Sequence, residues 1–107
     1  MNQENIDLKE KLRQDCDLSN WKMLHPNFVR DELFIIDQSL DFIDTCALAA
    51  SNDSKTIGEY IEKALIKRPD GYDVERWHKE KPLFQCLVIS PHVFVQLTDI
   101  SLKKPQD

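Results

Sequence analysis

Apolar residues recur three or four positions apart along much of the chain, as they do on the buried face of an α-helix. Leu8, Leu12 and Cys16 form the first such stripe, and Pro26 is expected to kink or split the second helix. Ser19 or Asn20 is expected to cap the second helix, Ser39 the third, and Asp70 or Asp73 the last. The spacing predicts five helices, over roughly residues 5–17, 20–29, 39–50, 54–64 and 73–80.

Shorter apolar runs between these stretches predict strands. Leu33–Ile36 is a β-branched and aromatic run that is too short for a helix, and residues 65–67 form a briefer one. Near the carboxyl end, Ser90 and Pro91 divide two longer runs, Leu83–Ile89 and residues 92–98. A proline between two such runs is typical of a turn, so the sequence predicts a β-hairpin there.

A two-residue turn fixes the register of this hairpin, because paired residues in antiparallel strands share a face. Ile89 then pairs with His92, and Cys86 pairs with Val95. One face is uniformly apolar and is expected in the core: Phe84, Cys86, Val88, Val93, Val95 and Leu97. The other face is mixed and is either exposed or covered by a helix: Leu83, Gln85, Leu87, Ile89, His92, Phe94, Gln96 and Thr98.

These elements predict an α+β fold. About five helices would pack on a small, mainly antiparallel sheet of three or four strands, with the carboxyl-terminal hairpin in the core. A chain of 107 residues has the size of one domain, which we expect to span residues 1–99. Residues 100–107 are charged and contain proline, so they are expected to form a frayed tail.

Composition narrows the setting in which such a domain works. The first residues lack the basic start and apolar run of a secretion signal, and no apolar stretch approaches the length needed to cross a bilayer. The three cysteines are odd in number and widely spaced, which favours a reducing compartment, so we expect a cytoplasmic protein without a membrane partner. The net charge of −5 disfavours broad affinity for nucleic acid.

Three segments taken together resemble a known bacterial family: WKMLHPNFVR, LFIIDQSLDFIDTCALAASND and ERWHKEKPLFQCLVISPHVFVQ. In this order they are similar to the domain of unknown function 2288, with the likeness covering about residues 18–97. His92 departs from the family pattern, which usually has tryptophan there. The resemblance implies a bacterial cytoplasmic protein and supplies no activity.

Neither a metal site nor a nucleophile is indicated by spacing. His25, His78 and His92 lie in three different predicted elements, and no cysteine has a histidine within four positions, so we expect neither a metal nor a cofactor. The hairpin brings the strands of Cys86 and His92 together, but the register points them to opposite faces. No catalytic residue is therefore assigned.

Three carboxylates near the start of the third predicted helix are the remaining candidates for chemistry. Asp37, Asp41 and Asp44 could act as acid and base at this corner, which keeps an enzyme open as an alternative. Capping and the helix dipole explain the same residues without chemistry.

Binding surfaces provide the other hypotheses. The basic residues Lys63, Lys67, Arg68, Arg76 and Lys79 could bind nucleic acid weakly, although acidic residues are interleaved with them. The mixed hairpin face offers an interaction surface for a protein partner or a second copy of the chain. We favour a non-catalytic protein-interaction or regulatory module over an enzyme. The candidate residues of that interaction surface are Leu87, Ile89, His92 and Phe94.

Overall fold

The computed structural model describes the backbone of residues 2–98 and the side chains of residues 7–98. The predicted tail at 100–107 lies outside the described residues. The helices are α1 (Asn2–Asp15), α2 (Trp21–Val29), α3 (Phe42–Ala50), α4 (Ser54–Glu62) and α5 (Gly71–Glu80). The strands are β1 (Asp17–Asn20), β2 (Leu33–Ile36), β3 (Ile66–Lys67), β4 (Leu83–Ile89) and β5 (His92–Leu97).

The strands form a single sheet in the order β1-β4-β5-β2-β3, with β5 at its centre. The predicted hairpin and its register are confirmed, since Ile89 pairs with His92 and Cys86 with Val95. Every neighbouring pair is antiparallel except β2 and β5, which run parallel. The α+β prediction is therefore correct, but the sheet has five strands and not three or four among the described residues. The prediction missed β1, whose residues it divided between a helix end and a helix cap.

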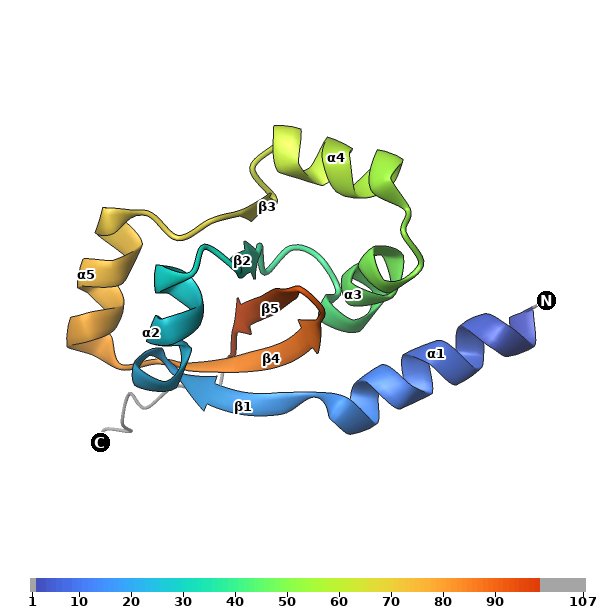
Figure 1. The fold of residues 1–107 in the computed structure, drawn as a ribbon, viewed down its shortest axis with the longest axis horizontal. Helices are drawn as coiled ribbons and strands as arrows, with labels where there is room; N and C mark the ends of the chain where they lie inside the picture. The colour runs from blue at the N-terminus through green and yellow to red at the C-terminus, as the bar shows by residue number, and fades with distance from the viewer. Residues whose placement is uncertain (1, 99–107) are drawn as a thin grey trace.

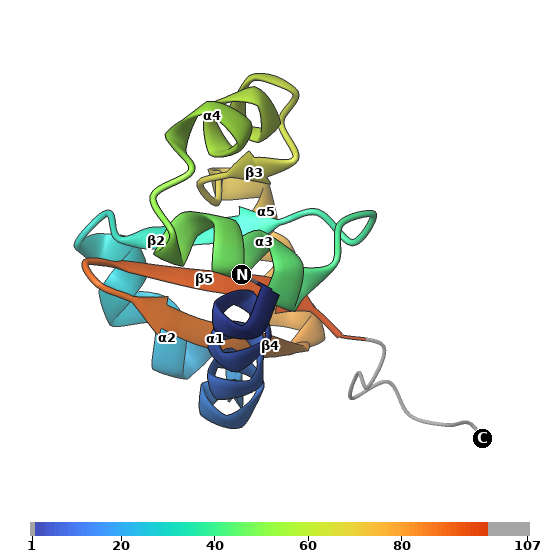
Figure 2. The same ribbon diagram turned by 90° about the vertical axis from the view of Figure 1, so that its right-hand side faces the viewer.

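Helices cover both faces of this sheet. Figure 2 shows α1 and α3 in front of the strands and α2 and α5 behind them. In Figure 1 the helix α4 lies beside β3, at the opposite edge of the sheet from β1. No helix within residues 2–98 is long and apolar enough to cross a membrane.

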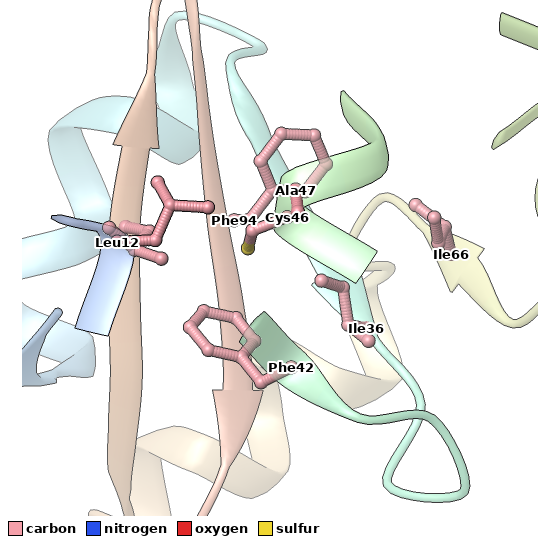
Figure 3. Close-up of a cluster of buried hydrophobic side chains, with 8 residues drawn as sticks. Leu12, Ile36, Phe42, Cys46, Ala47, Ile66 and Phe94 are labelled. Atoms are coloured by element: carbon pink, nitrogen blue, oxygen red, sulfur yellow. The ribbon is translucent and has the colours of Figure 1, made fainter. Parts of the chain in front are cut away.

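The core on the α1–α3 side contains the hairpin face that the sequence left undecided (Figure 3). Leu87 and Phe94 are only 2% and 5% exposed, because side chains from α1 and α3 pack over them. Gln96 on the same face is buried as well. Its amide donates to the carbonyls of Asp37 and Leu40 at 2.9 Å, which satisfies its donors. The buried members of this cluster are Leu12, Ile36, Phe42, Cys46, Ala47, Ile66, Leu87 and Phe94.

A second core lies between the sheet and α2 and α5. It contains the predicted interior residues Phe84, Val93 and Val95, all of which are buried. Val88 was expected among them, but it is 67% exposed, because β1 pairs only with residues 83–86 and leaves this part of β4 at the edge of the sheet. The buried members of this cluster are Trp21, Leu24, Leu33, Ile35, Trp77, Phe84, Val93 and Val95.

Local capping fixes where the helices begin. Asn20 caps α2, and Asp70 caps α5 in a reciprocal capping box with Asp73, as the sequence predicted in outline. The expectation that Ser39 begins the third helix is wrong. Asp41 is the N-cap and accepts the amide of Asp44 at 2.9 Å, so the helix starts at Phe42.

Pro26 lies inside α2, which is continuous from Trp21 to Val29 and is not split. Proline lacks the amide that would bond to the carbonyl one turn earlier, so the helix gives up one hydrogen bond at this point. The aromatic packing of α2 against the sheet compensates for this loss.

Candidate functional site

The predicted interaction surface on the hairpin is not exposed as a patch. Leu87 and Phe94 are core residues, while Ile89 and His92 are only half-buried. His92 lies against the Phe34 ring, with centroids 5.2 Å apart. His92, Phe94 and Phe34 line one side of a small apolar cleft of about 290 Å³ that opens towards α4.

Most of the predicted nucleic-acid patch is occupied by ion pairs. Lys67 donates to Asp73 at 3.0 Å, Arg68 pairs with Asp31, and Arg76 lies 3.9 Å from Glu80. The hydrogen bond to Asp73 raises the pKa of Lys67 above its usual range. Only Lys63 and Lys79 of the patch have no ion pair among the described side chains. Such pairing leaves little net positive charge to attract a phosphate backbone.

The three carboxylates of the predicted corner each have a local structural partner. Asp37 accepts the amide of Ser39 at 2.9 Å, and hydrogen bonds from Ser39 hold the pKa of Asp37 below its usual range. Asp41 is the cap of α3, and Asp44 pairs with Lys9 of α1 at 3.0 Å. The arrangement ties α1 to the start of α3, and each carboxylate has a structural role.

Burial raises the pKa of two thiols, one of which, Cys86, was considered as a nucleophile. The pKa of Cys46 rises to about 12 and that of Cys86 to about 11, chiefly through burial. A thiol with so high a pKa is a weak nucleophile at neutral pH. Among residues 7–98 no group of three potential ligands is arranged to hold a metal ion.

A groove between α2 and α5 brings together residues that the sequence had treated separately. It has a volume of about 730 Å³, within the usual range for small-ligand sites. Two tryptophans form its floor, and two lysines and two histidines stand around it. The residues that line it are Asn20, Trp21, Lys22, His25, Trp77, His78, Lys81 and Leu83.

The floor of the groove is rigid and apolar. Trp21 and Trp77 are 5% and 2% exposed, and their ring centroids lie 5.2 Å apart at an angle of 54°. Trp77 also packs edge-on against Phe84 of β4 at 5.0 Å. Because both indoles are held in the core, they have little freedom to move, and they form a rigid base beneath the groove while presenting almost no surface of their own to solvent.

The rim of the groove carries basic side chains. Lys22, His25, His78 and Lys81 are all exposed, and the lining includes no carboxylate. The first turn of α2 begins at the same place and contains no acidic residue, so its positive dipole end adds to the field. On a chain with a net charge of −5, this is a local reversal of sign that suits a negatively charged ligand group.

Comparison with known families and structures fits this arrangement of elements. The model of a family described as "Protein of unknown function (DUF2288)" matches residues 7–97. The chain belongs to the DUF2288 family. No curated protein matches this chain significantly. The NMR solution structure of PA1075 from Pseudomonas aeruginosa is similar to it, with a TM-score of 0.72 and 21% sequence identity over 84% of this chain and 83% of that one.

The resemblance seen in the sequence is thereby confirmed, and the similar structure supports the fold. Two of the segments that carry the DUF2288 resemblance, one beginning at Trp21 and the other containing Trp77, supply most of the groove lining.

A repeated spacing in this DUF2288 chain marks the residues of the two helices that line the groove. Trp21 is followed by His25, and Trp77 by Lys81, each one helical turn later. Each indole is therefore followed four residues later by a basic side chain, His25 within α2 and Lys81 at the C-cap of α5. The sequence alone did not bring these residues together, because nothing local shows that α2 and α5 are neighbours.

A further hollow of the DUF2288 chain, about 800 Å³ in volume, lies at the open end of the hairpin beside Gln85, Gln96 and Leu97. Its amides bond to the protein itself: Gln85 donates to Gln96 at 2.9 Å, and Gln38 donates to the carbonyl of Leu97 at 3.0 Å. It borders Thr98, the last described residue. The internal bonding favours a structural role for these amides over ligand recognition.

Proposed function

We propose that this chain is a non-catalytic binding module and that its binding site is the α2–α5 groove. The ligand would carry a negative charge on an apolar or aromatic body. One observation carries the proposal: four cationic or titratable side chains and no carboxylate surround a floor of two buried tryptophans. The charge would bind at the rim, and the apolar body would lie in the groove between α2 and α5.

The test uses two probes that differ by one charged group. 8-Anilinonaphthalene-1-sulfonate has an aromatic body and a permanent anion, and N-phenyl-1-naphthylamine has the same ring system without the sulfonate. In ¹H–¹⁵N spectra the sulfonate should shift the amides of the first turn of α2 and the last turn of α5. Shifts elsewhere only, or equal binding of the neutral probe, would contradict the proposal.

Variants of the rim lysines separate a specific site from a general effect of charge. Replacing both Lys22 and Lys81 by glutamine should weaken sulfonate binding, by up to about fivefold for each lost pair. Lys55→Gln with Lys63→Gln makes the same change in net charge on the exposed surface of α4 and its C-cap. This control pair should leave the affinity unchanged, and equal losses in the two double variants would exclude the groove.

The same ligand chemistry can come from a small molecule or from an acidic segment of a partner protein. A capped Asp-Phe-Asp peptide tests the second source, with Asn-Phe-Asn as its uncharged match. Specific binding of the acidic peptide would support a protein-interaction module, as the sequence analysis favoured. Binding of the naphthalenesulfonate without the peptide would assign the groove to small anionic ligands.

A protein contact at the apolar cleft beside α4 is a second candidate. Ile61 is 47% exposed at this cleft and faces the same hollow as Phe34 and His92. Self-association is the simplest form of this contact, since twofold pairs are the commonest assemblies. Light scattering at high concentration should then show a dimer that Ile61→Glu dissociates. A monomer at every concentration would refute self-association.

A reducing cytoplasmic location agrees with this proposed role. Cys16, Cys46 and Cys86 are all free thiols, and two of them have strongly raised pKa values. Fractionation of the native cell should recover the protein with cytoplasmic markers, and recovery in an exported fraction would contradict this location.

A further inference from the structure

Two of the four rim groups of the α2–α5 groove are histidines. His25 lies on α2 and His78 on α5, and both imidazoles are exposed. Histidine is the side chain whose unperturbed titration falls closest to physiological pH. The positive charge of the groove is therefore expected to depend more strongly on pH than the charge of a site lined by lysines alone.

His25 is held at the rim by its neighbours. Its ring meets Trp21 edge-on at 5.6 Å and lies 6.1 Å from Phe28. These contacts keep the imidazole beside the apolar floor, where a bound aromatic body would place its anionic group. On the opposite wall, His78 lies in the last turn of α5, one residue after Trp77.

The other polar or charged groups that line the groove with the two histidines are few. They are Lys22 on α2, Lys81 after α5 and Asn20 from β1, while Leu83 from β4 is apolar. With no carboxylate in the lining, protonated imidazoles have no anionic partner within the groove. A ligand anion would be that partner.

We propose that anion binding in the α2–α5 groove is coupled to proton uptake by His25 and His78, so that the site binds its ligand more tightly as pH falls. This inference rests on the proposed function of the groove. Each histidine that is neutral in the free protein and charged in the complex binds one proton with the ligand. Reciprocal linkage then requires the ligand affinity to rise with proton concentration.

The test measures the dissociation constant of 8-anilinonaphthalene-1-sulfonate between pH 8.5 and pH 5.5. The sulfonate stays ionised over this range, so any change of affinity belongs to the protein. Affinity should rise by up to about fivefold per histidine, the upper end for exposed ion pairs. Calorimetry in two buffers with different ionisation enthalpies should show net proton uptake near pH 6.5.

Variants assign the effect to the two imidazoles. His25→Gln with His78→Gln should abolish the pH dependence between pH 8.5 and pH 5.5. His92→Gln, which alters the histidine beside Phe34, should keep the full pH dependence. Circular dichroism at both ends of the pH range verifies that each variant is folded.

The outcomes distinguish a failure of proton coupling from a failure of the proposed function. If the probe shows no binding in the groove at any pH, the proposed function fails. If it binds in the groove with the same affinity at pH 5.5 and 8.5, the groove stands and proton coupling is refuted. Retention of the pH dependence in the double histidine variant also refutes the assignment to His25 and His78.

Discussion

Leu87 and Val88 are neighbours on β4 whose burial is the reverse of what local patterning suggested. Leu87 is 2% exposed within the α1–α3 core, and Val88 is 67% exposed on the other face. Substituting each by alanine therefore tests the two-sided burial of the hairpin directly. The expected difference is large enough to measure without ambiguity.

The magnitude follows from what surrounds Leu87. Its cluster includes Leu12 from α1 and Phe42 and Cys46 from α3, so truncation would leave a cavity enclosed by three elements. Leu87→Ala should lower the free energy of unfolding by about 2–5 kcal/mol. At about 3 kcal/mol this lowers the melting temperature by about 12–24 °C in a domain of this size. Val88→Ala should cost less than about 1 kcal/mol, mainly through β-propensity.

Urea unfolding followed by far-ultraviolet circular dichroism measures both variants. Leu87→Met serves as a control that conserves volume, and it should cost less than about 1.5 kcal/mol. If Val88→Ala were as destabilising as Leu87→Ala, the burial of the two faces would be wrong. The same conclusion would follow if Leu87→Ala cost less than 1 kcal/mol, because a residue on an exposed surface behaves in that way.

Three further perturbations test the fold around the candidate sites. Asp73→Ala removes the acceptor of both Lys67 and the Asp70 amide and should cost about 2–4 kcal/mol in urea unfolding, whereas a loss below 0.5 kcal/mol would show that the capping box is dispensable. Asp41→Ala should cost about 1 kcal/mol as a lost cap, and an unchanged unfolding midpoint would move the start of α3 elsewhere. With its pKa raised from 9.0 to about 11, Cys86 should react with iodoacetamide at pH 8 at least about tenfold more slowly in the native than in the unfolded protein, and rapid native labelling would revive it as a nucleophile.

Local signals in the sequence were sufficient for the elements whose causes are local. The hairpin at Ser90 and Pro91 and its register follow from turn chemistry and strand alternation, and Asn20 and Asp70 cap helices as their side chains predict. Ser39 does not cap the helix, because its backbone amide donates to the Asp37 carboxylate in a turn. The helix begins after Asp41, whose carboxylate accepts the amide of Asp44. Ser39 and Asp41 are both residue types that cap helices, and only the path of the chain after β2 distinguishes them.

The strand β1 was missed because its sequence, Asp17–Asn20, has no strand propensity of its own. It pairs with β4 along its whole length, so the ladder is formed by a partner more than 60 residues away in the chain. Pairing of this kind is decided by tertiary structure, since it depends on the available edge of β4. The same strand places Asn20 and the start of α2 beside the groove.

By itself the sequence determined the α+β class, the helical stripes, the hairpin and the family, because these depend on periodicity, capping and turns within short segments. Tertiary structure decided which hairpin face is buried, since α1 and α3 cover Leu87 and Phe94 from distant parts of the chain. It also decided that the ring centroids of Trp21 and Trp77 lie 5.2 Å apart. The basic residues four positions after them, His25 and Lys81, line the same groove for the same reason. The physical reason is that a binding surface formed by two helices depends on their relative position, and the packing of both helices against the same sheet fixes that position.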